Sequence, residues 1–184
     1  MNSESLPDNT GENQEKVLDP RVESLAIPLA RDYAEKNYPK LEDGTFKPAW
    51  RDVNGENELR DKSPENLMEE GYSELAAHEA VIDIANQPYN EYSEYWKEQN
   101  RGGAKFLIGL MDERGADTLS ALDLKDEKVR AEYGDLIHNN WLERNDWIPE
   151  SDPKSKPFAE LSPEEQQKDI DQLAVLQKWI AEQK

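Results

Sequence analysis

The sequence contains no cysteine among its 184 residues. Disulfide bonds, thiolate zinc sites, iron–sulfur clusters and cysteine nucleophiles are therefore excluded. Only two histidines are present, which excludes a histidine-rich metal site. No pairing of a nucleophile with a base is recognisable either. We therefore expect a non-enzymatic protein that has neither a metal nor a cofactor.

Long apolar runs are also missing. Leu, Ile, Val and Phe together make up 35 of the 184 residues, about 19%, which with high net charge borders on the composition of disordered chains. No run approaches the roughly 18 apolar residues of a membrane-spanning helix. The first five residues lack the basic and apolar regions of a secretory signal. These absences predict no membrane contact and a cytoplasmic location.

Basic residues are scarce: 22 Lys and Arg face 41 Asp and Glu, for a net charge of −19. Direct nucleic-acid binding is not expected, because it requires a basic face. Residues 63–96 hold eight acidic residues and no Lys or Arg. Three interpretations stay open: a solvated face, a surface for a basic protein partner, or a nucleic-acid mimic that acts as an inhibitor or decoy. The candidate partner surface comprises Glu65, Glu69, Glu70, Glu74, Glu79 and Asp83.

Apolar residues recur at helical period in most of the chain, which predicts a single all-α domain of five to six helices over residues 21–184. A flexible tail is expected at 1–20, and a long irregular loop at 38–62. Ser-Pro pairs at 63–64 and 162–163 are typical helix starts. Gly102 and Gly103 are interpreted as a helix–helix connection, with a phosphate-binding turn as the alternative. The expected helical segments are 28–37, 63–85, 89–99, 104–114, 126–144 and the segment after Ser162.

The C-terminal third carries a series of motifs in fixed order. They are Leu136-Ile137-His138-x-x-Trp141, then Trp147, then Pro157-Phe158-x-x-Leu161-Ser162-x-x-Glu165, then Asp169. This order, over about residues 129–180, resembles the ryanodine-receptor repeat (RyR) domain in its stand-alone bacterial or viral type. The resemblance extends the module to residues 126–184 and implies about four helices with a ligand-sensing or interaction role. It implies no catalytic residues. The chain has Trp147-Ile148-Pro149 where the family continues with a tyrosine–glycine and a longer basic stretch.

A candidate ligand site follows from the same segment. His138 and Trp141 lie three residues apart, hence on nearly one face of a helix. The candidate residues are His138, Trp141, Arg144, Trp147 and Phe158, which combine flat apolar surfaces with hydrogen-bond donors. They predict a regulatory module that binds a small polar or nucleotide-like molecule. The alternative is a core histidine bonded to a loop carbonyl, with Trp141 anchoring the 145–160 loop.

Two weaker motifs are interpreted as structural. Asp52-x-Asn54-Gly55-x-x-Glu58 resembles part of a calcium loop, but its twelfth position is Ser63, so a turn is favoured. His78-Glu79 lacks the second histidine of a zinc protease motif, because Ile82 occupies that position.

Overall fold

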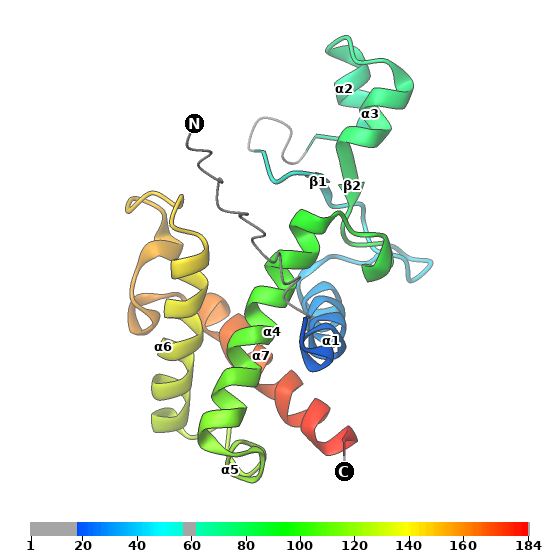
Figure 1. Ribbon diagram of the computed structural model, residues 1–184. Helices are drawn as coiled ribbons and strands as arrows, with labels where there is room; N and C mark the ends of the chain where they lie inside the picture. Colours follow the sequence, from blue (N-terminus) through cyan, green and yellow to red (C-terminus); the bar gives the residue numbers. More distant parts are fainter. Residues whose placement is uncertain (1–17, 57–61, 184) are drawn as a thin grey trace, which may run out of the picture.

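The computed structural model describes residues 18–56 and 62–183, and Figure 1 shows their arrangement. The expected all-α domain is confirmed, with seven α-helices in the described residues where five to six were predicted. These are α1 (Pro20–Asn37), α2 (Pro64–Glu69), α3 (Glu74–Ala80), α4 (Glu94–Arg114), α5 (Ala116–Ser120), α6 (Glu127–Arg144) and α7 (Pro163–Glu182). Two short antiparallel strands, β1 (Trp50–Asp52) and β2 (Val81–Asp83), complete the fold, with Asp52 opposite Val81.

The core lies between α1, α4, α6 and α7. In Figure 1 the long helix α4 runs through the middle of the molecule, with α1 on one side and α6 on the other. Leu25, Leu107, Leu173 and Leu176 are among its fully buried side chains. Polar contacts fix the helix ends: the Trp179 indole donates to the Ser24 hydroxyl at 3.0 Å, and Arg101 pairs with Glu23 at 2.6 Å. The apolar residues are few, but the helical period concentrates them on facing surfaces.

Helix α1 begins eight residues earlier than predicted. Asp19 accepts a hydrogen bond from the Arg21 backbone N–H, and Pro20 occupies the first turn, where its missing N–H costs nothing. Pro28 therefore lies inside the helix instead of starting it. Val22 and Leu25, which precede Pro28, are buried in the core, and this burial offsets the cost of an internal proline. The predicted tail falls mainly on residues 1–17, which lie outside the described residues.

The predicted break at Gly102 and Gly103 is wrong, because both glycines lie inside the continuous helix α4. A Cβ atom at Gly102 would lie 2.7 Å from Cδ of Arg144 on α6. A Cβ at Gly103, which is buried, would lie 3.5 Å from the Gln172 amide oxygen on α7. The glycines are thus contact points where other helices approach α4. Residues 89–91 form only a 3-10 turn before α4.

The predicted helix over 63–85 is divided into α2, α3 and β2. Gly71 adopts φ +101° after α2, a conformation that favours glycine, and Ser73 then caps α3 by accepting from the Ala76 N–H. β2 pairs with β1, which lies inside the region 38–62 that was predicted to be irregular. Residues 57–61 of that region lie outside the described part. Helices α2 and α3 extend away from the helical body (Figure 1), around a small core of Leu67, Ala77 and Val81. We call residues 62–80 the α2–α3 projection.

Residues 18–56 and 62–183 contain neither a candidate membrane-spanning helix nor a candidate metal-binding cluster. None of their helices has the length and apolar character needed to cross a membrane. Within the same ranges, no three His, Asp or Glu side chains gather closely enough to hold a metal ion.

Candidate functional site

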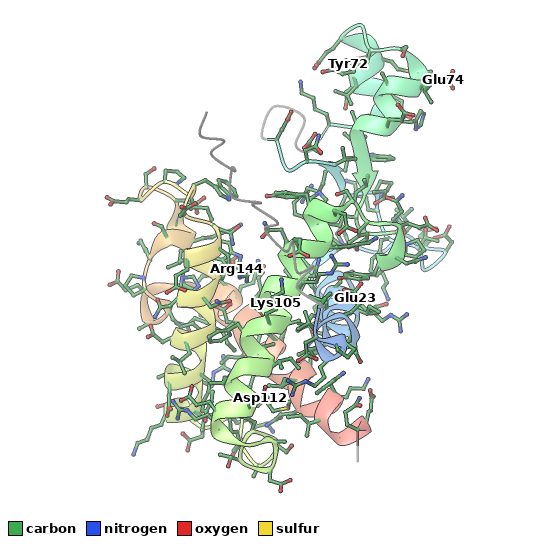
Figure 2. The ribbon with its side chains drawn as sticks, viewed as in Figure 1. Glu23, Tyr72, Glu74, Lys105, Asp112 and Arg144 are labelled. Atoms are coloured by element: carbon green, nitrogen blue, oxygen red, sulfur yellow. The ribbon has the colours of Figure 1, made fainter. Side chains whose placement is uncertain are left out.

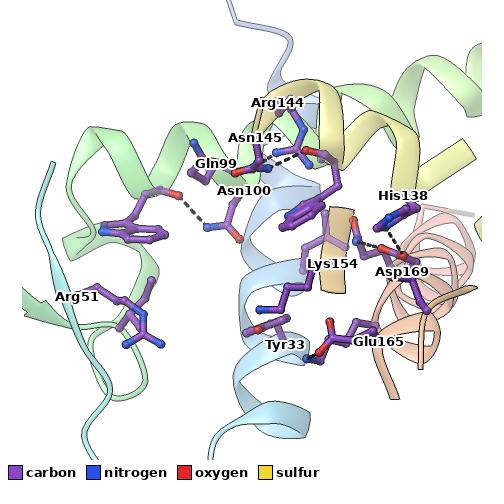
Figure 3. Close-up of a pocket in the computed structure, with 18 of the residues that line it drawn as sticks. Tyr33, Arg51, Gln99, Asn100, His138, Arg144, Asn145, Lys154, Glu165 and Asp169 are labelled. Atoms are coloured by element: carbon purple, nitrogen blue, oxygen red, sulfur yellow. Dashed lines mark hydrogen bonds and ion pairs between the residues drawn. The ribbon is translucent and has the colours of Figure 1, made fainter. Parts of the chain in front are cut away.

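A cavity of about 300 Å³ opens between α1, β1, α4, α6 and α7. We call it the central cavity; Figure 3 shows its lining. Helix α4 contributes Trp96, Gln99 and Asn100, and helix α6 contributes His138, Trp141 and Arg144. The i, i+3, i+6 spacing places these three α6 side chains on neighbouring turns of one helix face. The sequence therefore brings His138, Trp141 and Arg144 together as predicted.

Arg144 is the unusual group of the cavity. Its Nε donates to the Asn140 side-chain oxygen at 3.1 Å, and its Nη1 donates to the Gln99 carbonyl at 3.0 Å. Both acceptors are neutral, and among the described residues no carboxylate forms an ion pair with this guanidinium. Burial alone lowers the pKa of Arg144 below its ordinary value. A partly buried positive charge that lacks a counter-ion is a favourable place for an anion.

Other basic side chains add to this charge. The cavity lining contains Arg51, Arg144, Lys154 and Lys168, against Glu165 and the carboxylate of the His138–Asp169 pair. Lys168 is bound to Glu165 at 2.6 Å, and Arg51 donates to the Trp50 carbonyl at 2.7 Å. Figure 3 shows Lys154 near Tyr33, on the other side of the cavity from Arg51. If the His138–Asp169 pair is counted as neutral, Lys168 and Glu165 balance each other, and Arg144 and Lys154 add basic groups to the lining in a protein of net charge −19.

Aromatic rings form the apolar part of the lining. The Trp141 ring stacks on His138 with ring centroids 5.8 Å apart and planes inclined by 19°. The Trp96 indole N–H donates to the Asp52 carbonyl at 2.7 Å, which fixes that ring against β1. Tyr33 and Tyr38 meet edge to face at 5.8 Å on the α1 side. The cavity thus combines flat apolar rings with the Arg144 guanidinium, which has no counter-ion among the described residues.

His138 is a buried part of the cavity lining and is anchored by two polar contacts. It is 3% exposed, its Nε2 lies 2.8 Å from the Lys156 carbonyl, and its Nδ1 lies 3.3 Å from Asp169 Oδ2. A carbonyl oxygen only accepts, so Nε2 carries a proton, and a second proton is needed between Nδ1 and the carboxylate. The predicted alternative for His138, a hydrogen bond to a loop carbonyl, is confirmed. This anchoring holds Trp141, whose ring lies against it.

Both groups of the His138–Asp169 pair have a raised pKa, which favours their protonated forms. Burial opposes a charge on His138, but the hydrogen bond and negative charge of Asp169 outweigh it, and the pKa of His138 is raised. Burial also raises the pKa of Asp169, against the opposing effect of His138. Because both shifts favour protonation, we expect the folded protein to keep the shared proton above the ordinary histidine range.

Two predicted ligand residues lie outside the central cavity. Trp147 is 49% exposed and lines a small neighbouring pocket. Phe158 is 4% exposed, packs with Leu161 and Ile170, and is not among the residues that line the cavity. A Cβ atom at Gly134 would lie 2.2 Å from the Phe158 ring, so that glycine makes room for the phenylalanine. Phe158 is therefore a core residue, and its prediction as a ligand contact is not supported by its position.

Several cavity residues were missed by sequence reasoning. Trp96, Lys154 and Arg51 come from separate elements, and no local pattern links them to α6. One signal was present: adjacent glycines inside an otherwise regular helical pattern indicate a close approach by another element. Gly102 marks that approach, and Arg144 is the residue that makes it.

The acidic residues occupy two different environments. Glu65, Glu69, Glu70, Glu74 and Glu79 are exposed on the α2–α3 projection. Figure 2 shows Glu74 and Tyr72 at its far end. Asp83 differs from the prediction: it is half-buried on β2.

The carboxylate of Asp83 accepts from the Ala49 N–H at 3.0 Å and from the Asn86 side-chain amide at 2.7 Å. Asp83 therefore serves the fold and is not part of an open partner surface.

The Asp52 motif forms a turn, as predicted. Asp52 Oδ1 accepts from the backbone N–H groups of Asn54 and Glu56 at 2.8 and 2.6 Å, and Gly55 has φ +76°. Glu58, the last residue of the motif, lies outside the described residues.

Comparison of the chain with protein-family models, with curated proteins and with solved structures finds no match. The resemblance of residues 126–184 to the RyR domain therefore stays a prediction. The geometry of the central cavity is therefore the basis for assigning a function.

Proposed function

We propose that the chain is a non-enzymatic regulatory module, of the RyR-repeat type, that binds a small anionic molecule with a planar ring. A nucleoside monophosphate represents this class of ligand. The observation that supports the proposal best is Arg144, a partly buried guanidinium in a cavity wall with only neutral hydrogen-bond partners among the described residues.

The phosphate would lie against Arg144. A guanidinium carries five N–H donors, and Arg144 uses two of them, on Asn140 and Gln99. The remaining donors can form the paired hydrogen bonds that arginine makes with phosphate oxygens. Lys154 adds a second positive charge to the lining from the segment before α7. An anion here replaces a missing counter-ion, so its binding removes the cost of the unpaired charge.

The planar ring would lie against the aromatic wall of Trp96 and Trp141. Stacking of a base on an aromatic side chain contributes about 1–3 kcal/mol and suits any flat ring. A volume of about 300 Å³ is at the lower end of small-molecule sites, which fits one nucleotide. Neutral amides at Gln99 and Asn100 also line the cavity and can hydrogen-bond to ring edges or sugar hydroxyls.

The test compares a whole ligand with its parts. Isothermal titration and thermal unfolding would be measured with AMP, adenosine, ribose 5-phosphate and inorganic phosphate. We expect AMP to bind more tightly than any part and to raise the melting temperature by mass action. If AMP binds no better than adenosine, the assignment of Arg144 to a phosphate is wrong.

A matched pair of variants sharpens this test. Arg144→Gln should weaken AMP binding by about 10- to 100-fold, the effect of losing a charged hydrogen bond. The unliganded variant should be at least as stable as the wild type, because an unpaired partly buried charge is removed. Arg114→Gln, which removes an arginine paired with Glu113 and Glu132 on the surface, should leave affinity unchanged. Equal affinity of Arg144→Gln and wild type would contradict the proposal.

A second candidate function is an acidic inhibitor or decoy that acts on a basic protein. It is favoured by the α2–α3 projection, which carries five exposed glutamates together with the exposed side chains of Met68, Tyr72 and Leu75. The triple variant Glu69→Lys, Glu70→Lys, Glu74→Lys should abolish binding to a lysine-rich amphipathic peptide, and salt should weaken the wild-type complex. Peptide binding that is unaffected by this reversal would reject the candidate.

A further inference from the structure

A second, smaller pocket lies beside the central cavity, at the end of β1. It has a volume of about 50 Å³, and four of its lining residues define it here: Asp52, Tyr95, Trp96 and Trp147. We call it the aromatic pocket. It shares Trp96, Gln99 and Asn145 with the central cavity, but its one charged group is a carboxylate, whereas the central cavity is dominated by arginine and lysine.

Asp52 is the unusual residue of this pocket. The residue is 1% exposed. Its Oδ1 accepts hydrogen bonds from the backbone N–H groups of Asn54 and Glu56. These two hydrogen bonds explain the turn, but they involve only one of the two carboxylate oxygens. Oδ2 is buried and has no hydrogen-bond partner. A buried carboxylate oxygen without a donor is costly, and such an atom needs an explanation beyond the fold.

Three aromatic residues line the pocket together with Asp52. The Tyr95 and Trp96 rings are perpendicular, with centroids 5.0 Å apart. The Tyr95 ring packs directly against the backbone at Gly55, where a Cβ atom would lie 2.2 Å from the ring. Trp147 is 49% exposed and forms the outer part of the lining. Aromatic faces attract organic cations, and an arrangement of several such faces with a carboxylate is the usual receptor for alkylammonium groups.

We infer that the aromatic pocket binds an alkylammonium group, which donates to Asp52 Oδ2 while its methylene groups contact Tyr95, Trp96 and Trp147. A water molecule occupies about 30 Å³ of liquid, so about 50 Å³ holds an ammonium head with its first methylene. A metal ion is disfavoured because the described residues offer it no second and third acidic or imidazole ligand. An anion would be repelled by Asp52.

The ammonium group can belong to a free amine or to a lysine side chain of another protein. The probes would be n-butylammonium and the peptide Gly-Ser-Lys-Ser-Gly, titrated calorimetrically into the full chain. Saturable binding of either probe supports the inference. Peptide affinity at least tenfold above that of n-butylammonium identifies a protein source, and equal affinities identify a free amine. The same peptide with Nε-acetyl-lysine, which has no charge, should not bind.

Variants of the pocket test the assigned roles. Asp52→Asn keeps the Oδ1 acceptor for both backbone N–H groups but removes the charge, and it should weaken binding about tenfold or more. Trp147→Ala should weaken it about three- to tenfold by removing one aromatic face. Asp112→Asn, an exposed carboxylate on α4 paired with Arg21, is the matched control and should not change affinity. Trp147→Ala remains decisive if Asp52→Asn fails to fold, because Trp147 is half-exposed.

Three results would overturn the inference. The first is no saturable binding of either ammonium probe, which would leave only a buried water for Oδ2. The second is unchanged affinity in Asp52→Asn or, if that variant does not fold, in Trp147→Ala. The third is equally tight binding of the acetylated peptide. Failure of AMP binding is a separate result, because the probes here carry no phosphate and Arg144 does not line the aromatic pocket.

Discussion

Two glycines of α4 offer a controlled test of how closely α6 approaches that helix. Gly109 is exposed, and a Cβ atom added there meets nothing within 4 Å. Gly109→Ala should therefore stabilise the protein by about 0.5–1 kcal/mol, the difference in helix propensity between alanine and glycine. Gly102→Ala gains the same propensity, but its Cβ would lie 2.7 Å from Arg144 Cδ.

The contact at Gly102 should outweigh the gain. Relief of the overlap requires α6 or the middle of the Arg144 side chain to move, and insertion of a methyl group into a packed contact costs about 1–3 kcal/mol. The movement also endangers the hydrogen bond from Arg144 to the Gln99 carbonyl. We expect Gly102→Ala to be less stable than Gly109→Ala by about 1–3 kcal/mol.

Urea unfolding followed by far-ultraviolet circular dichroism measures this difference. With a urea dependence of about 1–3 kcal/mol per molar, a gap of about 1 kcal/mol separates the midpoints by roughly 0.3–1 M. Equal midpoints for the two variants would show that α6 does not press on α4 at Gly102. The position assigned to Arg144 in the cavity wall would then be wrong.

Two further predictions concern Gly134 and the His138–Asp169 pair. Gly134→Ala should destabilise the protein by about 1–3 kcal/mol in urea unfolding, because the new methyl group overlaps the Phe158 ring, while AMP affinity of the folded fraction stays unchanged. The His138–Asp169 pair should raise the free energy of unfolding over that of a His138→Gln, Asp169→Asn double variant most at acidic pH, below the ordinary pKa of both groups. This advantage should be lost as the pH rises through the raised folded-state pKa values of Asp169 and His138. Both pKa shifts are upward, so the folded state binds more protons than the unfolded chain, and an advantage that grew with pH would contradict the shared proton.

Helices with strong local signals were predicted closely. The expected segment 126–144 and the observed α6, Glu127–Arg144, differ by one residue, because Asp126 caps the first turn with its own side chain. Helix α7 begins at Pro163 after the Ser162 cap, as the Ser-Pro pair indicated. These signals are contained within a few residues, so the sequence alone displays them.

Errors arose where distant residues decide the local structure. Gly102 was expected to mark the end of a helix, but it lies inside α4. It accommodates the side chain of Arg144, which lies 42 positions further along the chain and so gives no local signal. Phe158 seemed suited to a ligand site, but Gly134 opens a space for its ring in the core. The spacing on α6 correctly grouped His138, Trp141 and Arg144. Trp96 joins them only through tertiary packing, which a pattern within one helix cannot show.

The strand pair at the base of the α2–α3 projection has a further consequence. Asp52 lies opposite Val81, so the chain leaves the helical body and returns to it at one point. Residues 62–80 are therefore arranged as an insertion, with their own small core of Leu67 and Ala77 closed by Val81. Insertions whose ends meet can change in length and sequence without altering the host fold. The acidic projection and the two cavities of the helical body can thus evolve, or be exchanged, independently of each other.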